Sequence, residues 1–129
     1  MQIPVPDLEA GLAFYRDQLG HELIWRTSTS AGLRMPDTDA ELVLQTQREQ
    51  METDLLVASA DEAVAAIRRA GGQVAVEAFD IPIGRCAVVR DPWGNVLVLL
   101  DGTKGSLTTD ADGVVLTDAS GAPRLRPRP

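Results

Sequence analysis

The sequence repeats one pattern of strand, helix and three strands, with a period of about fifty residues. The first helix is expected after Asp7, whose carboxylate can cap it, and ends at Gly20. Leucines and Tyr15 recur between these two residues at the spacing of one helical face. The second helix is expected to begin at Ser59, which together with Glu62 matches a capping box, and to end at a pair of glycines. This repetition predicts two modules of equal design.

Runs of aliphatic and β-branched residues between turn residues predict the strands. They are expected at residues 1–5, 22–27, 32–35 and 41–46 in the first module, and at 53–57, 73–79, 84–90 and 95–101 in the second. Each module then forms a curved, mostly antiparallel sheet with its helix on one face, which predicts an α+β protein. In strand 41–46, Leu42 and Leu44 share the face under the helix, and Glu41, Val43 and Gln45 share the opposite face.

The composition excludes several classes of protein. A length of 129 residues suits one compact domain, and the formal charge of -7 at pH 7 argues against a nucleic-acid-binding protein. The chain holds one cysteine, Cys86, so it forms no internal disulfide, and it begins without a signal-peptide pattern. No apolar run approaches the roughly 20 residues of a membrane helix. We therefore expect a cytoplasmic protein that binds neither nucleic acid nor membrane.

Two motifs resemble those of a known family. In segment 5–20, an Asp7-Leu8 start and a Phe14-Tyr15 pair precede Leu19-Gly20. The second motif is the turn Asp91-Pro92-Trp93-Gly94-Asn95, which leads into an aliphatic strand. Both resemble the superfamily of glyoxalases, bleomycin-resistance proteins and extradiol dioxygenases, also called the vicinal oxygen chelate fold.

The resemblance covers residues 1–103, as modules 1–51 and 52–103. It implies that the two sheets surround a cleft and that the chain forms a homodimer. Residues 104–129 depart from the family pattern. A small hairpin is expected at 107–117, and the segment 119–129, rich in proline and arginine, is expected to be a disordered tail.

The resemblance also bears on metal binding. In metal-dependent members of the superfamily, a divalent ion is held by one His, Glu or Gln from each of four strands. The matching positions fall before the first residue, where an upstream start would supply the side chain, and on Val43, Glu52 and Val98. Because valine has no lone pair for a metal, we expect a metal-free protein without a cofactor. A non-standard carboxylate site of Glu41, Glu52 and Asp54 is the alternative.

The sole histidine and the sole cysteine are interpreted as structural residues. His21 follows the first helix, where its positive form suits the helix dipole, and it has no adjacent nucleophile. Cys86 lies on a predicted strand beside Arg85 and is expected to be buried. Catalysis by His21 is the less favoured alternative.

Recognition of a small molecule is the function that remains. Aromatic, polar and charged side chains on or beside the strands suit stacking on a ligand and hydrogen bonding to it. The candidate ligand-binding residues are Trp25, Glu41, Val43, Gln45, Asp54, Phe79, Arg85 and Val98. We therefore predict a metal-free, dimeric protein that binds a drug or metabolite and is similar to the bleomycin-resistance branch. The alternatives are a lyase, isomerase or dioxygenase of the same superfamily with a non-standard site, and an accessory protein whose open sheet docks a partner.

Overall fold

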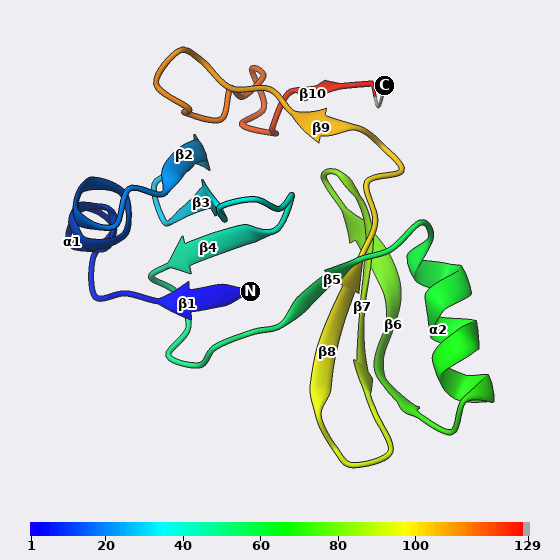
Figure 1. Cartoon of the computed structure of the whole chain (residues 1–129). Coiled ribbons are helices and arrows are strands. Elements are labelled where there is room, and N and C mark those ends of the chain that lie inside the picture. The colour runs from blue at the N-terminus through cyan, green and yellow to red at the C-terminus, as the bar shows by residue number, and fades with distance from the viewer. Residues whose placement is uncertain (128–129) are drawn as a thin grey trace. The chain divides into compact units, whose positions relative to one another are not determined.

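The computed structural model describes residues 1–127 of the chain. It divides into two compact units, each built around a four-stranded sheet and a helix (Figure 1). Unit 1 contains Met1–Glu52 and Thr109–Leu116, and unit 2 contains Thr53–Thr108 and the described residues from Thr117 onward. Each unit therefore holds one of the two modules that the repeat predicts.

Unit 1 follows the expected order of elements. These are β1 (Gln2–Pro4), a helix that starts as α1 (Leu8–Leu12) and continues as the π-helical segment η1 (Ala13–Gln18), β2 (Glu22–Arg26), β3 (Ser30–Arg34) and β4 (Glu41–Gln45). The strands lie in the order β1-β4-β3-β2. β1 runs parallel to β4, and the other neighbours are antiparallel.

Unit 2 repeats this plan. Its elements are β5 (Asp54–Leu56), α2 (Ala60–Arg69), β6 (Gln73–Ile81), β7 (Gly84–Arg90) and β8 (Val96–Leu100), followed by the short strands β9 (Ser106–Leu107) and β10 (Leu125–Arg126). The main sheet has the order β5-β8-β7-β6, with β5 parallel to β8.

Each sheet is mostly antiparallel, as predicted, and contains one parallel pair of strands. A helix separates the first strand of each module from the second, so both strands can run in the same direction. Two hairpin reversals then return the fourth strand to that direction. The fourth strand pairs with the first strand as well as with the third. Both sheets are therefore mixed, and the α+β class is confirmed.

Both helices begin at the predicted caps. The Asp7 carboxylate accepts a hydrogen bond from the Ala10 amide at 3.0 Å, and the Ser59 hydroxyl accepts one from the Glu62 amide at 3.2 Å. These bonds satisfy amides that have no partner within the helix. No helix in residues 1–127 has the length and apolar character needed to cross a membrane.

The first helix differs from the second by a π turn. The Leu19 amide donates to the Phe14 carbonyl at 3.0 Å, an i to i+5 bond that widens the last turn. The helix then ends at Gly20, whose φ of 83° lies in the left-handed region that favours glycine. The wider turn takes Leu19 off the buried face, so Leu19 is 54% exposed although Leu8 and Leu12 are buried.

Each helix covers one face of the sheet in its own unit. The apolar core of unit 1 contains Leu8, Leu12, Ala31, Leu33, Leu42 and Leu44, and that of unit 2 contains Val64, Ala87, Val89 and Leu99. The prediction that Leu42 and Leu44 lie under the helix is therefore confirmed. Below, the face of a sheet that its own helix does not cover is called its open face.

The C-terminal segment extends unit 2 and returns once to unit 1. β9 and β10 pair antiparallel in unit 2. Residues 109–116 run along the edge of β2 in unit 1. There the Arg26 amide donates to the Gly113 carbonyl at 2.7 Å, and the Val115 amide donates to the Arg26 carbonyl at 2.9 Å. The segment 119–129, expected to be a disordered tail, contains β10 in its described part, and residues 128–129 lie outside the described residues.

Three aspartates close turns of the same kind. Asp91, Asp110 and Asp118 each accept, through Oδ1, hydrogen bonds from the backbone amides two and four residues ahead. A glycine with positive φ stands three residues after each aspartate. The Asp-x-x-Gly spacing therefore forms the predicted turn between β7 and β8, and it forms two further turns in the C-terminal segment.

Candidate functional site

The open face of unit 1 carries a row of side chains that crosses the sheet. Trp25 of β2 pairs with Gly32 of β3, which pairs with Val43 of β4. Val43 pairs with Gln2 of β1, and Gln2 forms a β-bridge with Glu52. Residues that pair on neighbouring strands project from the same face. The row therefore has an aromatic end at Trp25 and a polar end at Glu52.

The Trp25 indole lies over Gly32 because this position has no side chain. A Cβ atom at residue 32 would stand 2.0 Å from the Trp25 Nε1 atom. The indole Nε1–H donates a hydrogen bond of 3.0 Å to the Glu41 carboxylate on β4. Glu41 therefore fixes the orientation of the indole, and two of the candidate ligand-binding residues form one structural pair.

Gln45, another candidate ligand-binding residue, bonds to the loop that follows β4. Its side chain is 4% exposed. Its Oε1 atom accepts hydrogen bonds from the amides of Gln47 and Arg48 at 2.8 and 2.7 Å, and its Nε2 atom donates to the Arg48 carbonyl at 2.9 Å. The Gln45 amide group therefore holds the loop after β4, and through it the backbone of Arg48.

The Arg48 side chain occupies the polar end of the row. Its Nη2 atom contacts the Oε1 atom of Gln2 and lies 3.6 Å from the Oε2 atom of Glu52. A guanidinium group therefore pairs with Glu52, the carboxylate that the sequence resemblance places at a metal position. Sequence analysis missed Arg48 because it lies in a loop outside the strands that the pattern uses.

The open face of unit 2 is mostly apolar. Asp54 of β5 pairs with Val98 of β8, and Phe79 of β6 pairs with Cys86 of β7. Leu56 and Phe79 are 72% and 42% exposed. Three of the candidate ligand-binding residues, Asp54, Phe79 and Val98, therefore share this face.

The residues interpreted as structural lie in structural positions. Cys86 is buried. The Nδ1 atom of His21 lies 3.3 Å from the Arg34 carbonyl oxygen, which joins the end of the first helix to β3.

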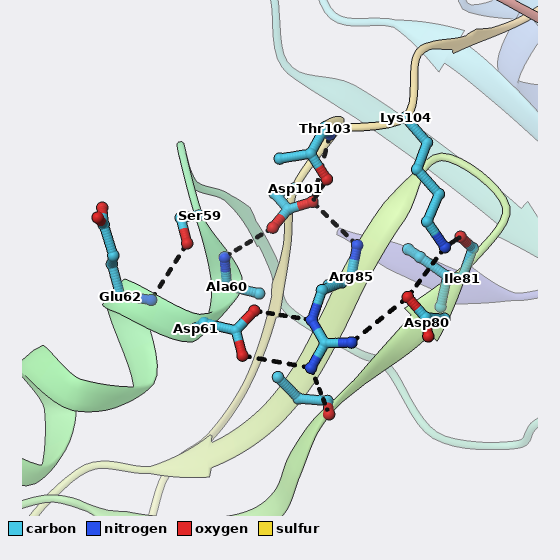
Figure 2. Close-up of polar contacts among 11 residues, drawn as sticks. Ser59, Ala60, Asp61, Glu62, Asp80, Ile81, Arg85, Asp101, Thr103 and Lys104 are labelled. Atoms are coloured by element: carbon cyan, nitrogen blue, oxygen red, sulfur yellow. Dashed lines mark hydrogen bonds and ion pairs between the residues drawn. The ribbon is translucent and has the colours of Figure 1, made fainter.

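Arg85 does not share the open face with the other candidates of unit 2. Figure 2 shows its guanidinium between Asp61 of α2 and Asp80 of β6. Nε and Nη2 donate to the Asp61 carboxylate at 2.7 and 3.2 Å, and Nη2 also donates to the Ala78 carbonyl at 3.0 Å. The Lys104 ammonium, with help from Arg85, holds the pKa of Asp80 below its usual range. Odd-numbered residues of β7 face the helix, so Arg85 joins α2 to the sheet.

Asp101 is the most constrained ionisable side chain near this cluster (Figure 2), and sequence analysis did not single it out. Its side chain is 1% exposed. Oδ2 accepts from the Ala60 amide at the start of α2 at 2.7 Å. Oδ1 accepts from the Arg85 amide at 2.9 Å and from the Thr103 hydroxyl at 2.8 Å. Burial opposes the charge, but these bonds together lower the pKa of Asp101 to about 2.

The sequence and the fold match a known family. A family model for the Glyoxalase/Bleomycin resistance protein/Dioxygenase superfamily matches residues 1–99. The chain belongs to this superfamily. No curated protein sequence matches it.

Solved structures share the superfamily fold with the chain. A hypothetical protein from Bacillus halodurans C-125 has a TM-score of 0.66 at 15% identity, over 83% of this chain and 94% of that one. An NAD-dependent benzaldehyde dehydrogenase from Legionella pneumophila has a TM-score of 0.58 at 24% identity, over 78% and 95% of the two chains. The Mn(II)-bound glyoxalase from Novosphingobium aromaticivorans has a TM-score of 0.55 at 23% identity, over 83% of this chain and 40% of that one. At identities this low, the structural similarity indicates a common fold alone.

The positions that the sequence resemblance assigns to metal ligands carry few donor atoms. Val43 and Val98 offer no lone pair. Glu52 is paired with Arg48, and Glu41 accepts the indole N–H of Trp25. Among residues 1–127, no three His, Cys, Asp or Glu side chains are grouped so that they could hold a metal ion. The residue types at these positions therefore do not supply the donors that a divalent ion takes in the metal-dependent members.

Proposed function

We propose that the protein binds a planar small molecule on the open face of unit 1 and does so without a metal ion. The Trp25 indole carries this proposal, because it lies over Gly32 and is oriented by Glu41. An aromatic side chain that is already oriented offers stacking area at a low cost in conformational entropy. Val43 continues the apolar surface on the next strand.

The proposal also includes a cytoplasmic homodimer. Leu56, Val76 and Phe79 on the open face of unit 2 are 72%, 46% and 42% exposed, and burial against a second copy would remove this apolar area from water. Sedimentation at micromolar concentration is expected to give twice the subunit mass, and a sedimenting monomer would contradict this part of the proposal.

Nuclear magnetic resonance of the two indole N–H groups tests ligand binding. Titration with 2-methylnaphthalene is expected to shift the Trp25 signal saturably, because the probe stacks on this ring. Trp93 provides an internal control, since it lies in the turn between β7 and β8, is 84% exposed and should not shift. The Trp93→Phe variant assigns the two signals. If neither this probe nor quinoline nor indole shifts the Trp25 signal, the proposal is wrong.

The alternative is a metal-dependent lyase, isomerase or dioxygenase with a non-standard site, which the Mn(II)-bound structural neighbour favours. Elemental analysis of untagged protein purified without chelators distinguishes the two. We expect far less than one transition-metal ion per subunit. A content near one ion per subunit would support the enzyme, and Glu41, Glu52 and Asp54 would then be the first residues to change.

A further inference from the structure

We infer that Arg48 binds an oxygen acceptor of the ligand, a carboxylate or carbonyl group, beside the aromatic surface of Trp25 and Val43. This inference rests on the proposed function, and it names the class of ligand. The guanidinium stands at the polar end of the row, where it contacts Gln2 and pairs with Glu52.

The position of Arg48 is built into unit 1. The buried amide of Gln45 makes three hydrogen bonds to the loop after β4, and two of them go to the backbone of Arg48. The side chain contacts Gln2 of β1, which pairs with Val43. A cation held from both its backbone and its head group is oriented before a ligand arrives, which lowers the entropy cost of binding.

Arg48 keeps donors for a ligand. Its contacts with Gln2 and Glu52 both use Nη2, and a guanidinium has five N–H groups. The side chain is 50% exposed. The remaining N–H groups can therefore reach a ligand atom from solvent.

The spacing of the strands sets the shape of the ligand. Trp25 lies over β3, Val43 is on β4 and Gln2 is on β1. Neighbouring strands are about 4.8 Å apart, so the step from Val43 to Gln2 is close to the distance between the outer carbons of a two-ring aromatic system. A ring placed over Trp25 and Val43 brings a substituent at its far end to Arg48. The ligand class is therefore a planar aromatic carboxylate or carbonyl compound.

The pairing with Glu52 defines the charge preference. Glu52 cancels the charge of Arg48, so a neutral carbonyl can bind as well as a carboxylate, and the Glu52 charge weakens binding of the carboxylate. Removal of Arg48 and removal of the Glu52 charge should therefore have opposite effects on an anionic ligand.

The test compares 2-naphthoate, 2-naphthamide and 2-methylnaphthalene, with the Trp25 indole N–H signal as readout. In the unmodified protein, 2-naphthoate and 2-naphthamide are expected to bind about tenfold more tightly than 2-methylnaphthalene. Arg48→Met keeps the aliphatic stem and should remove this preference while the affinity for 2-methylnaphthalene stays the same. Glu52→Gln should tighten 2-naphthoate binding severalfold. Arg69→Met on α2 is the matched control and should change none of these affinities.

The outcomes separate this inference from the proposed function. Equal affinities for the three probes, or an Arg48→Met variant that keeps the preference, would overturn the role of Arg48 and leave ligand binding at Trp25 intact. Failure of all three probes to shift the Trp25 signal would overturn both. The inference and the proposed function are both supported if the unmodified protein prefers 2-naphthoate and 2-naphthamide, if Arg48→Met loses this preference, and if Arg69→Met keeps it.

Discussion

Asp101→Ala is expected to lower the free energy of unfolding by about 3 kcal/mol at pH 7. The substitution leaves the amides of Ala60 and Arg85 without the acceptor that they have in the buried network. It also removes the negative charge at the start of α2, where the helix dipole favours an anion. Urea unfolding followed by circular dichroism measures the loss.

The contribution of Asp101 depends on pH in a defined direction. Its folded pKa of about 2 lies below the ordinary value of 3.8, so the folded state favours the ionised form. This stabilisation amounts to about 2 kcal/mol of unfolding free energy. It is fully present above pH 4 to 5 and is lost as the pH falls through 2. Asp101→Asn does not titrate. The gap in stability between the unmodified protein and this variant is therefore expected to narrow between pH 5 and pH 2.

Asp80→Asn is the matched control for Asp101. Asp80 also lies near Arg85, but its side chain is 69% exposed and its partners are the charged ends of Arg85 and Lys104. Ion pairs at such exposed sites contribute little, so this variant should unfold at nearly the same urea concentration as the unmodified protein. An effect of Asp80→Asn as large as that of Asp101→Ala would contradict the role assigned to the buried network.

Gly32→Ala is expected to displace the Trp25 indole and to weaken 2-methylnaphthalene binding at least tenfold. The added Cβ would stand 2.0 Å from Nε1 and 2.4 Å from Cε2 of the indole, so the ring must leave its position and its hydrogen bond to Glu41 must break. Overpacking of this kind costs about 1 to 3 kcal/mol of stability. The Trp25 indole N–H signal should move toward the value of an exposed tryptophan.

A double-mutant cycle with Trp25→Ala provides the control. When Trp25 is alanine, the obstacle to a Cβ at residue 32 is gone, and Gly32→Ala should then have little effect on stability. Additive effects of the two substitutions would show that Gly32 is required for a reason other than the space it leaves for the indole.

The sequence predicted the features whose causes are local. Asp7 and Ser59 cap helices through amides three residues away, and Asp91 closes its turn through amides two and four residues away. The alternation of residues in β4 predicted correctly that Leu42 and Leu44 are buried. In each case the side chain and its partner lie within one turn or on one strand.

The features that sequence analysis missed depend on distant partners. The Asp101 carboxylate bonds to Ala60 and to Arg85, which come from other elements of the module. An aspartate directly after an aliphatic strand was the only local signal. The parallel pairing of β1 with β4 likewise depends on the order of strands across the sheet.

Two side chains show how far contacts can change a role inferred from strand position. Gln45 has the strand parity of the open face, yet its amide turns to the loop after β4. Arg85 is predicted to line the cleft, but odd-numbered residues of β7 lie on the face of α2, where Arg85 bonds to Asp61. A residue's face can be predicted from alternation, whereas its hydrogen-bond partner requires the neighbouring elements.

The return of residues 109–116 to the edge of β2 has a consequence for synthesis on the ribosome. Unit 1 consists mainly of the first part of the chain. Its edge strand β2, however, can form its hydrogen bonds with Gly113 and Val115 only after residue 116 has been made. A ribosome adds about 5 to 20 residues per second, so the edge of β2 stays unpaired for several seconds after the rest of its sheet exists. The module that is translated first is therefore the one whose sheet is completed late, and its unpaired edge is exposed to other nascent chains during that interval.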